Sequence, residues 1–339
     1  MANQEAHSYP ITRRSEQEIH RGPAPNYGDD SRRSRPVDPR IGSRWVWVSV
    51  IAVIVFFAVY VAAVRTYLGQ YLEDAALLGA KSISTTELDD SLDQLRVISV
   101  ASLVVMLFVY AVIGFVRKAW DIAIAGMAIL GIASVAAELF KRVILQRPDL
   151  AGLDEPGAHN SFPSGHTTIA MAILLSLIVV VGYRWRGWVV GFAMIWASSV
   201  GAATVTARWH RFSDTLGADA LALFVAALVA LWLLRRGSIS VSEPKTYPLR
   251  AIYVALAALL MVGAFIVGFV ILFKTLDNFD VFTALATARQ QGVSPQLTAH
   301  LDPVFNQNMF YAAQSLALAF STGAALWFWG TFHRIQTKG

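Results

Sequence analysis

Residues 51–64 read IAVIVFFAVYVAAV, an apolar run without a charged side chain. An α-helix satisfies its own backbone hydrogen bonds in lipid, whereas the strands of a lipid-spanning β-barrel alternate apolar and polar residues. This run does not alternate, so it predicts a membrane-spanning helix. A bilayer core requires about 20 apolar residues in helical form. Eight segments meet that requirement: 45–64, 97–116, 122–140, 167–183, 187–206, 215–234, 251–273 and 309–330.

The composition of the 339 residues agrees with this pattern. Hydrophobic residues make up 55% and charged residues 15%, whereas soluble domains carry about 25% charged residues. The mean hydropathy is +0.51. We therefore expect an all-α fold, a polytopic membrane helix bundle with eight transmembrane helices. The sequence contains no cysteine, which excludes disulfides, zinc–thiolate sites, iron–sulfur clusters and thiol nucleophiles.

The first 44 residues are polar, rich in proline, serine and arginine, and free of apolar runs. This composition predicts a disordered basic tail, 1–44, rather than a signal peptide. With the tail in the cytoplasm, 18 of the 28 lysines and arginines lie on the cytoplasmic side and ten on the other side. We therefore expect a multi-pass protein of the cell membrane with both termini cytoplasmic. The same asymmetry accounts for the net charge of +5, so nucleic acid is not an expected partner.

Three short motifs place cations, histidines and a carboxylate on one predicted face of the membrane. They are KRVILQRP at 141–148, FPSGHTT at 162–168 and RWHRFSD at 208–214. Half of the ten cations on the outer side lie in the connections 141–166 and 207–214. Positive charge on the translocated side works against the usual insertion preference. We therefore expect these cations to serve a function other than topology.

These residue types suit a phosphate group. Arginine offers a planar fork to paired phosphate oxygens, and lysine offers a compact charge. A Pro-Ser-Gly turn that opens a helix presents free backbone N–H groups, and Gly165 lets that backbone approach a ligand closely. One histidine can attack phosphorus while a second protonates the leaving oxygen. His210 and Asp214 are four residues apart, so on a helix they would share a face and the carboxylate could orient the imidazole.

Together the three motifs resemble the signature of the type 2 phosphatidic acid phosphatase superfamily, a family of integral membrane lipid phosphate phosphatases. The pattern of that family is Lys-x6-Arg-Pro, then Pro-Ser-Gly-His, then Ser-Arg-x5-His-x3-Asp. Residues 163–166 (PSGH) match the second motif in full, and His210 with Asp214 match the end of the third. The motifs also occur in the family's order and between the expected helices.

The resemblance implies a six-helix phosphatase core at 45–236. The region 237–339, with the two additional predicted transmembrane helices and an outer loop, lies outside that core. It implies that His210 is the nucleophile that forms a phosphohistidine, that Asp214 orients it, and that His166 is the general acid. The family mechanism uses no metal and no other cofactor. The residues that it implies for phosphate binding are Arg147, Ser164, Gly165 and a lysine.

Two departures from the family pattern concern phosphate binding, and the first is the spacing of the lysine. Lys141 is separated from Arg147 by five residues rather than six, and Phe140 occupies the family position. Phenylalanine cannot bind phosphate. We predict that Lys141 takes the role through a shortened turn, with Arg142 as the alternative.

The second departure is the arginine of the third motif, whose position is occupied here by Thr204. A transferring phosphoryl group needs several donors. We therefore predict that a neighbouring arginine binds phosphate instead. The two candidates are Arg211, which adjoins the expected nucleophile, and Arg208.

Two carboxylates lie within the predicted spans, where ionisable residues are costly. Glu138 precedes Lys141 and Arg142 by three and four residues, a helical spacing that favours an ion pair. Asp219 is expected to pair with one of the arginines of the third motif. Both carboxylates are therefore expected to support the site rather than to react.

The expected function is an integral membrane phosphatase that hydrolyses a lipid phosphate or diphosphate, such as phosphatidic acid or a polyprenyl diphosphate, at the outer face. Two alternatives stay open: a lipid-linked phosphotransferase that uses the same site, and a non-catalytic lipid-binding scaffold. A membrane lipid is the expected substrate. Three roles remain open for the last two helices, which could cover a lipid groove, self-associate or bind a protein partner.

Overall fold

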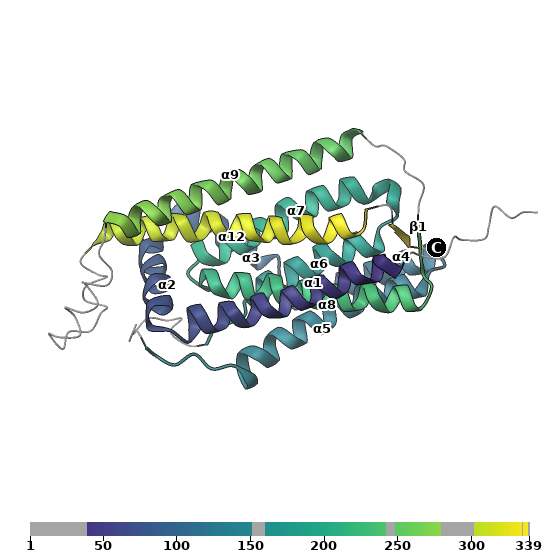
Figure 1. Ribbon diagram of the computed structural model, residues 1–339, viewed down its shortest axis with the longest axis horizontal. Coiled ribbons are helices and arrows are strands. Elements are labelled where there is room, and N and C mark those ends of the chain that lie inside the picture. Colours follow the sequence, from purple (N-terminus) through teal and green to yellow (C-terminus); the bar gives the residue numbers. More distant parts are fainter. Residues whose placement is uncertain (1–38, 151–159, 242–247, 279–301, 334, 338–339) are drawn as a thin grey trace, which may run out of the picture. The chain divides into compact units, whose positions relative to one another are not determined.

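The computed structural model describes residues 39–150, 160–241, 248–278, 302–333 and 335–337. These residues are mainly helical, and the predicted all-α fold is confirmed (Figure 1). The α-helices are α1 Pro39–Val59, α2 Tyr67–Gly79, α3 Thr85–Arg96, α4 Val100–Val116, α5 Trp120–Leu139, α6 Gly165–Val180, α7 Tyr183–Thr206, α8 Phe212–Arg235, α9 Pro248–Asn278 and α12 Pro303–Thr331. Short segments add π-helical turns at Tyr60–Val64 (η2) and Phe140–Ile144 (η4), a 3₁₀ turn at Ala80–Ser82 (η3), and strands β1 Ile239–Val241 and β2 Ile335–Thr337.

The described helices support six or seven membrane spans. Six helical segments are long and apolar enough to cross a membrane: Arg40–Val64, Trp120–Ile144, Tyr183–Thr206, Phe212–Arg235, Ala251–Asp277 and Pro303–Thr331. Helices α3 and α4, bent by 48° where they meet, form a seventh if they act as one span. Helix α6 has only 16 residues. The predicted count of eight spans is therefore not confirmed, although every predicted segment is largely helical.

The predicted tail overlaps the first helix. Residues 1–38, and the stretch 279–301 of the predicted outer loop, lie outside the described residues. Helix α1 begins at Pro39, inside the segment expected to be tail. The indole N–H of Trp45 is buried and donates to the Thr331 hydroxyl at 3.0 Å. The beginning of α1 is thereby joined to the end of α12.

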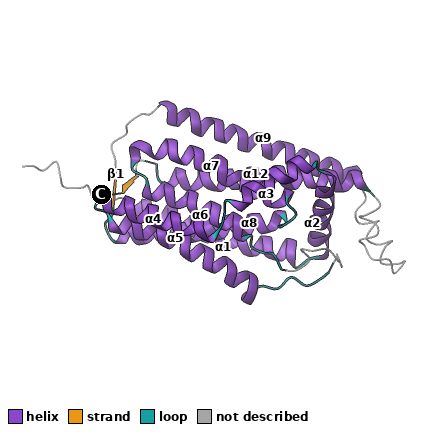
Figure 2. Ribbon diagram, turned by 180° about the vertical axis from the view of Figure 1, so that it is seen from behind, coloured by secondary structure: helices purple, strands orange, loops and turns teal. Residues whose placement is uncertain are grey.

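Helix α6 lies inside the bundle and packs against α5, α7 and α8. Leu174, Leu175, Ile178 and Val179 are completely buried on it. Helix α12 packs against α7 and α8 as well, while α9 lies beyond α12 (Figure 2). The helices after residue 237 thus pack against the helices of the predicted phosphatase core. The predicted domain boundary near residue 237 stays a prediction.

The acid-rich connection at 66–96 is helical and not an extended loop. Helix α2 lies across one end of the bundle in both views and packs against α12 (Figures 1 and 2). Its apolar residues Tyr71, Ala75 and Leu78, spaced by three or four, are buried with Phe305 and Phe310. That periodicity gives α2 one apolar face, which α12 covers. The same helix carries two buried carboxylates, Glu73 and Asp74, toward the neighbouring helix ends.

The other end of the bundle is joined by a short antiparallel pair of β1 and β2, in which Ser240 lies opposite Gln336. Arg117 donates to the Thr337 carbonyl at 2.9 Å, and the fully buried Arg186 donates to the Ile335 carbonyl at 2.8 Å. These bonds hold the C-terminal strand against the ends of α4 and α7. The three sequence motifs lie at the opposite end, beside α2.

Candidate functional site

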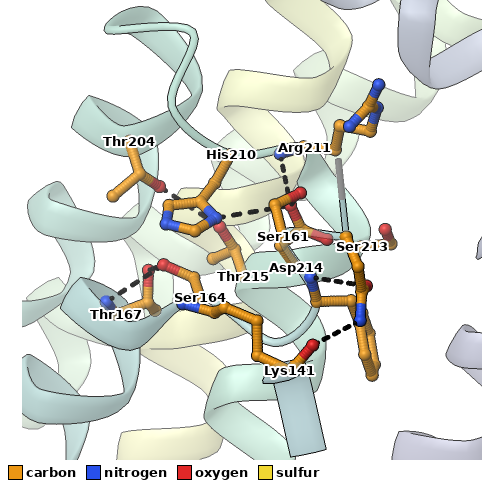
Figure 3. Close-up of polar contacts among 12 residues, drawn as sticks. Lys141, Ser161, Ser164, Thr167, Thr204, His210, Arg211, Ser213, Asp214 and Thr215 are labelled. Carbon is orange, nitrogen blue, oxygen red and sulfur yellow. Dashed lines mark hydrogen bonds and ion pairs between the residues drawn. The ribbon is translucent and has the colours of Figure 1, made fainter. Parts of the chain in front are cut away.

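The site is built around His210, which precedes α8. The backbone N–H of His210 donates to the Thr204 carbonyl at 3.2 Å, at the end of α7. Its Nδ1 lies 3.4 Å from Oδ2 of Asp214, in the first turn of α8 (Figure 3). The expectation that both residues share a helical face is wrong, because His210 belongs to the connection. A left-handed backbone at Arg208 (φ 58°) turns the chain so that the imidazole nevertheless faces the carboxylate.

The carboxylate of Asp214 is completely buried and has several partners. Its Oδ2 accepts hydrogen bonds from the backbone N–H of Arg211 at 2.9 Å and from the Ser161 hydroxyl at 2.5 Å. Its Oδ1 lies 3.6 Å from Nη2 of Arg147. These contacts fix the orientation of the group that faces Nδ1 of His210. The other imidazole nitrogen, Nε2, is therefore the one available to a ligand.

The second motif is bonded to the same turn of α8. The backbone N–H of Ser164 donates to the Asp214 carbonyl at 2.9 Å. The Ser164 hydroxyl caps α6 by accepting from the backbone N–H of Thr167 at 3.3 Å and from its hydroxyl at 3.0 Å (Figure 3). Gly165 and His166 follow as the first helical residues, whose N–H groups have no partner within the helix. The start of α6 thus presents backbone donors beside the histidines.

The two histidines come from different helix ends and lie near each other. His166 is half-buried at the start of α6, and its ring centroid is 6.5 Å from that of His210. Trp209 lies against His166 at 5.2 Å between centroids. The residues predicted as nucleophile and general acid therefore border one small region.

The structure separates the two candidate cations of the first motif. A Cβ atom built on Gly165 would lie 3.4 Å from Nζ of Lys141, so the ammonium is beside the start of α6. Arg142 is 77% exposed and pairs with Glu138 at 2.7 Å. Lys141 also pairs with Glu138, at 3.5 Å, as predicted. The turn that carries both is the wide π-helical η4 rather than a shortened turn.

Arg147 is the most enclosed cation of the site, with a side chain only 2% exposed. Its Nη2 lies 3.4 Å from Oε2 of Glu73 and 3.6 Å from Asp214. Its Nε and Nη1 are buried and have no hydrogen-bond partner among the described residues. A buried guanidinium donor without a partner is costly. These two N–H-bearing atoms are therefore available to an anion.

Arg211 and Arg208 lie in different environments. The Arg211 side chain is 3% exposed and pairs with Asp74 through Nη2 at 2.9 Å and Nε at 3.0 Å. Arg208 is exposed. Thr204, at the position of the family arginine, is completely buried and donates to the Gly201 carbonyl at 2.8 Å. Of the two candidates, Arg211 is the one that the structure encloses with the other site residues.

Sequence reasoning missed two carboxylates that α2 brings to the site. Glu73 accepts from the backbone N–H of Ser213 at 2.7 Å and faces Arg147, while Asp74 faces Arg211. Burial raises the pKa of both carboxyl groups, and the neighbouring arginines oppose that shift. The signal in the sequence that could have identified them is the acidic pair itself, which adjoins the apolar positions of a short helix. Nothing in the local pattern indicates which arginines it meets.

Each cation of the site thus already has a carboxylate beside it. The pairs are Lys141 with Glu138, Arg147 with Glu73, and Arg211 with Asp74. A phosphate group that enters this region would compete with these fixed carboxylates for the cations. The competition disfavours anions that bind weakly. No group of three or more His, Asp or Glu side chains in the described part of the chain is placed to hold a metal ion.

Comparison with known proteins adds a family match. Residues 122–238, which contain all three motifs, match the PAP2 superfamily. The fold is similar to the crystal structure of the first transmembrane PAP2-type phosphatidylglycerolphosphate phosphatase from Bacillus subtilis. The two share 20% sequence identity with a TM-score of 0.41, over 57% of this chain and 95% of that chain. No curated protein sequence matches this chain.

The buried ion pair between Asp74 and Arg211 predicts a large effect on stability. Asp74→Asn leaves the guanidinium buried beside an uncharged amide, and breaking such a pair typically costs about 3–5 kcal/mol. The matched control is Asp93→Asn, whose pair with Arg96 has side chains 69% and 73% exposed. Exposed pairs contribute less than about 1 kcal/mol. The thermal unfolding midpoint of the purified protein in detergent should fall clearly only for Asp74→Asn, and equal midpoints would contradict the buried pairing.

Proposed function

Because residues 122–238 match the PAP2 superfamily, we propose that the protein is an integral membrane phosphatase that hydrolyses a lipid phosphate or diphosphate. The observation that carries this proposal is the arrangement of His210. Its Nδ1 faces the buried Asp214 carboxylate, and its Nε2 is left for phosphorus. Phosphatidic acid and polyprenyl diphosphates are the substrate classes whose hydrocarbon chains could stay in the bilayer beside such a site.

In the proposed first step, the lone pair of His210 Nε2 forms a bond to phosphorus, and the bond between phosphorus and the leaving oxygen breaks. His166 donates a proton to that oxygen, so that it leaves as a neutral hydroxyl or a less charged phosphate. The Asp214 carboxylate stabilises the cationic imidazole. It stays ionised, because the proton on Nδ1 remains on the imidazole. The product of this step is a phosphohistidine.

In the second step, His166 accepts a proton from water, and the water oxygen attacks the phosphohistidine. The N–P bond breaks, its electron pair returns to Nε2 of His210, and inorganic phosphate is released. Donors from Lys141, Arg147, Arg211 and the start of α6 would hold the phosphoryl oxygens in both steps. Fixed donors of this kind stabilise the transition state without reorganisation.

Two alternatives use the same residues. In a phosphotransferase, a lipid or sugar hydroxyl would replace water in the second step. In a scaffold, the lipid phosphate would bind and no phosphorus bond would break. The buried imidazole–carboxylate pair favours an enzyme, because a binding site for phosphate needs cations but does not need an oriented histidine.

His210→Ala should reduce the release of inorganic phosphate from phosphatidic acid or a polyprenyl diphosphate to background, since the nucleophile is removed. His333→Ala, a histidine at the other end of the bundle, should retain full activity and serves as the control. EDTA should leave the wild-type rate unchanged, because the proposed positive charges belong to side chains, those of Lys141, Arg147 and Arg211.

Turnover by folded His210→Ala at the wild-type rate would contradict the mechanism. Consumption of the lipid phosphate only after addition of an acceptor alcohol, with formation of the phosphorylated alcohol instead of inorganic phosphate, would assign the phosphotransferase. Binding without turnover under either condition would assign the scaffold.

Arg211→Gln should lower kcat/KM on the order of 100- to 1000-fold, because we propose that Arg211 contributes a preorganised donor to the phosphoryl group. Arg208→Gln should have a small effect, since Arg208 is exposed. Because Arg211→Gln also removes the partner of Asp74, the double variant Asp74→Asn/Arg211→Gln separates the two roles. It should restore the thermal midpoint and leave activity low. Recovery of activity together with stability would show that Arg211 serves only the ion pair.

We further propose that the protein lies in the cell membrane with both termini cytoplasmic and the site outside, which the asymmetry of lysine and arginine supports. Leu150, exposed beside the site, and Ser240, in β1 at the opposite end, report the two faces. The sequence has no cysteine, so single replacements are specific. In intact cells, an impermeant maleimide should label Leu150→Cys and spare Ser240→Cys. The reverse pattern would place the site in the cytoplasm.

A further inference from the structure

A cavity of about 430 Å³ lies between α1, α8, α9 and α12. Its walls are apolar and include Val55, Leu223, Met261, Phe265 and Trp327. Asp219 on α8 is the one charged residue among the described residues that line it. A cavity of this size falls within the range of about 300–1000 Å³ that is typical of small-molecule sites. Nothing in the proposed hydrolysis uses this region.

The cavity is distinct from the site of the histidines. Asp219 follows Asp214 by five residues on α8, which at 3.6 residues per turn corresponds to a rotation of about 140°. The two carboxylates therefore point to different sides of the helix. Residues of α9 and α12, which lie outside the segment that matches the PAP2 superfamily, complete the cavity walls.

Asp219 is 4% exposed, and only one of its oxygens has a partner in the described structure. Oδ2 accepts from the Ser321 hydroxyl of α12 at 2.6 Å. Oδ1 is buried and has no hydrogen-bond partner among the described residues. The expected pairing of Asp219 with an arginine of the third motif is thus wrong, because Ser321 takes its place. A buried polar atom without a partner costs about 1–3 kcal/mol, so a ligand that supplies a donor would be favoured here.

The walls and the carboxyl group together restrict the ligand. No cation is among the described residues that line the cavity, so a phosphate or carboxylate headgroup would lack a counter-charge beside Asp219. A primary ammonium carries three donors, whereas the carboxyl group offers one oxygen without a partner among the described residues. An ammonium would therefore leave donors unpaired in an apolar cavity. A hydroxyl group needs one acceptor, and a hydrocarbon chain matches the remaining walls.

The position of α9 indicates where the ligand comes from. Only 6% of the most apolar stretch of this helix is buried within the protein, so its outer surface faces the bilayer. Phe265 and Met261 of α9 line the cavity from the inside. A molecule entering beside α9 therefore comes from the lipid phase rather than from water.

We propose that this cavity is a binding site for a lipid alcohol, with the hydrocarbon chain between α1, α8, α9 and α12 and the hydroxyl donating to Oδ1 of Asp219. This site is independent of phosphate hydrolysis and does not rest on it. Its specificity comes from one hydrogen bond in an apolar surrounding, where an unmade bond is costly.

The test uses the full-length protein in lipid nanodiscs and two photoreactive probes of equal chain length, a diazirine-bearing fatty alcohol and the corresponding alkane. The alcohol should label peptides of α8, α9 and α12 roughly tenfold more than the alkane, the effect of one net hydrogen bond. Asp219→Leu should reduce labelling by the alcohol to the level of the alkane. Asp219→Asn, which keeps an acceptor oxygen, should retain most of the preference.

Ala324→Phe, which fills the cavity from α12, should abolish labelling of these peptides by both probes. Equal labelling of the wild-type protein by alcohol and alkane would overturn the proposal. So would an unchanged preference in folded Asp219→Leu, or stronger competition by an alkylammonium than by the alcohol. Because none of these measurements involves phosphate release, failure of the proposed enzyme activity would leave the outcome unaffected.

Discussion

The arrangement of the site depends on the burial of Asp214 in the first turn of α8. A carboxylate without water must be compensated by hydrogen bonds and opposite charge. Its Oδ2 accepts from Arg211 N–H and Ser161 and faces His210, and its Oδ1 lies near Arg147. The main-chain carbonyl of the same residue accepts from Ser164. One residue therefore contacts all three motifs and fixes their relative positions. The orientation of the imidazole follows from these contacts.

The charges around this carboxylate are nearly balanced before any ligand binds. Helix α2 supplies Glu73 and Asp74 to cations that the sequence motifs supply, and α5 supplies Glu138 to Lys141. Fixed pairs keep long cationic side chains in one conformation, which lowers the entropic cost of organising donors around a phosphoryl group. The same pairs oppose binding of weakly held anions. The buried Nε and Nη1 of Arg147, which have no hydrogen-bond partner among the described residues, are the exception, and we propose that they bind the anion.

Much of the architecture could be predicted from local pattern. The helices follow from runs such as 51–64, because in lipid a helix satisfies all of its backbone hydrogen bonds within one segment. The start of α6 follows from Ser164 as its cap. Contacts between distant residues could not be predicted: Asp74 and Arg211 are 137 positions apart, and no periodicity relates them. The position of the Lys141 ammonium beside the start of α6 depends on the π-helical turn η4, and the position of His210 depends on the left-handed backbone at Arg208.

The central claim is that Asp214 holds Nδ1 of His210 and leaves Nε2 to attack phosphorus. The most direct test is acid-free quenching of the purified protein during turnover of a lipid phosphate, followed by mass-spectrometric and ³¹P NMR analysis of the peptide that contains residue 210. The account predicts an acid-labile phosphohistidine at His210 with phosphorus on Nε2. Phosphorus on Nδ1, or a covalent phosphate on a residue other than His210, would contradict it.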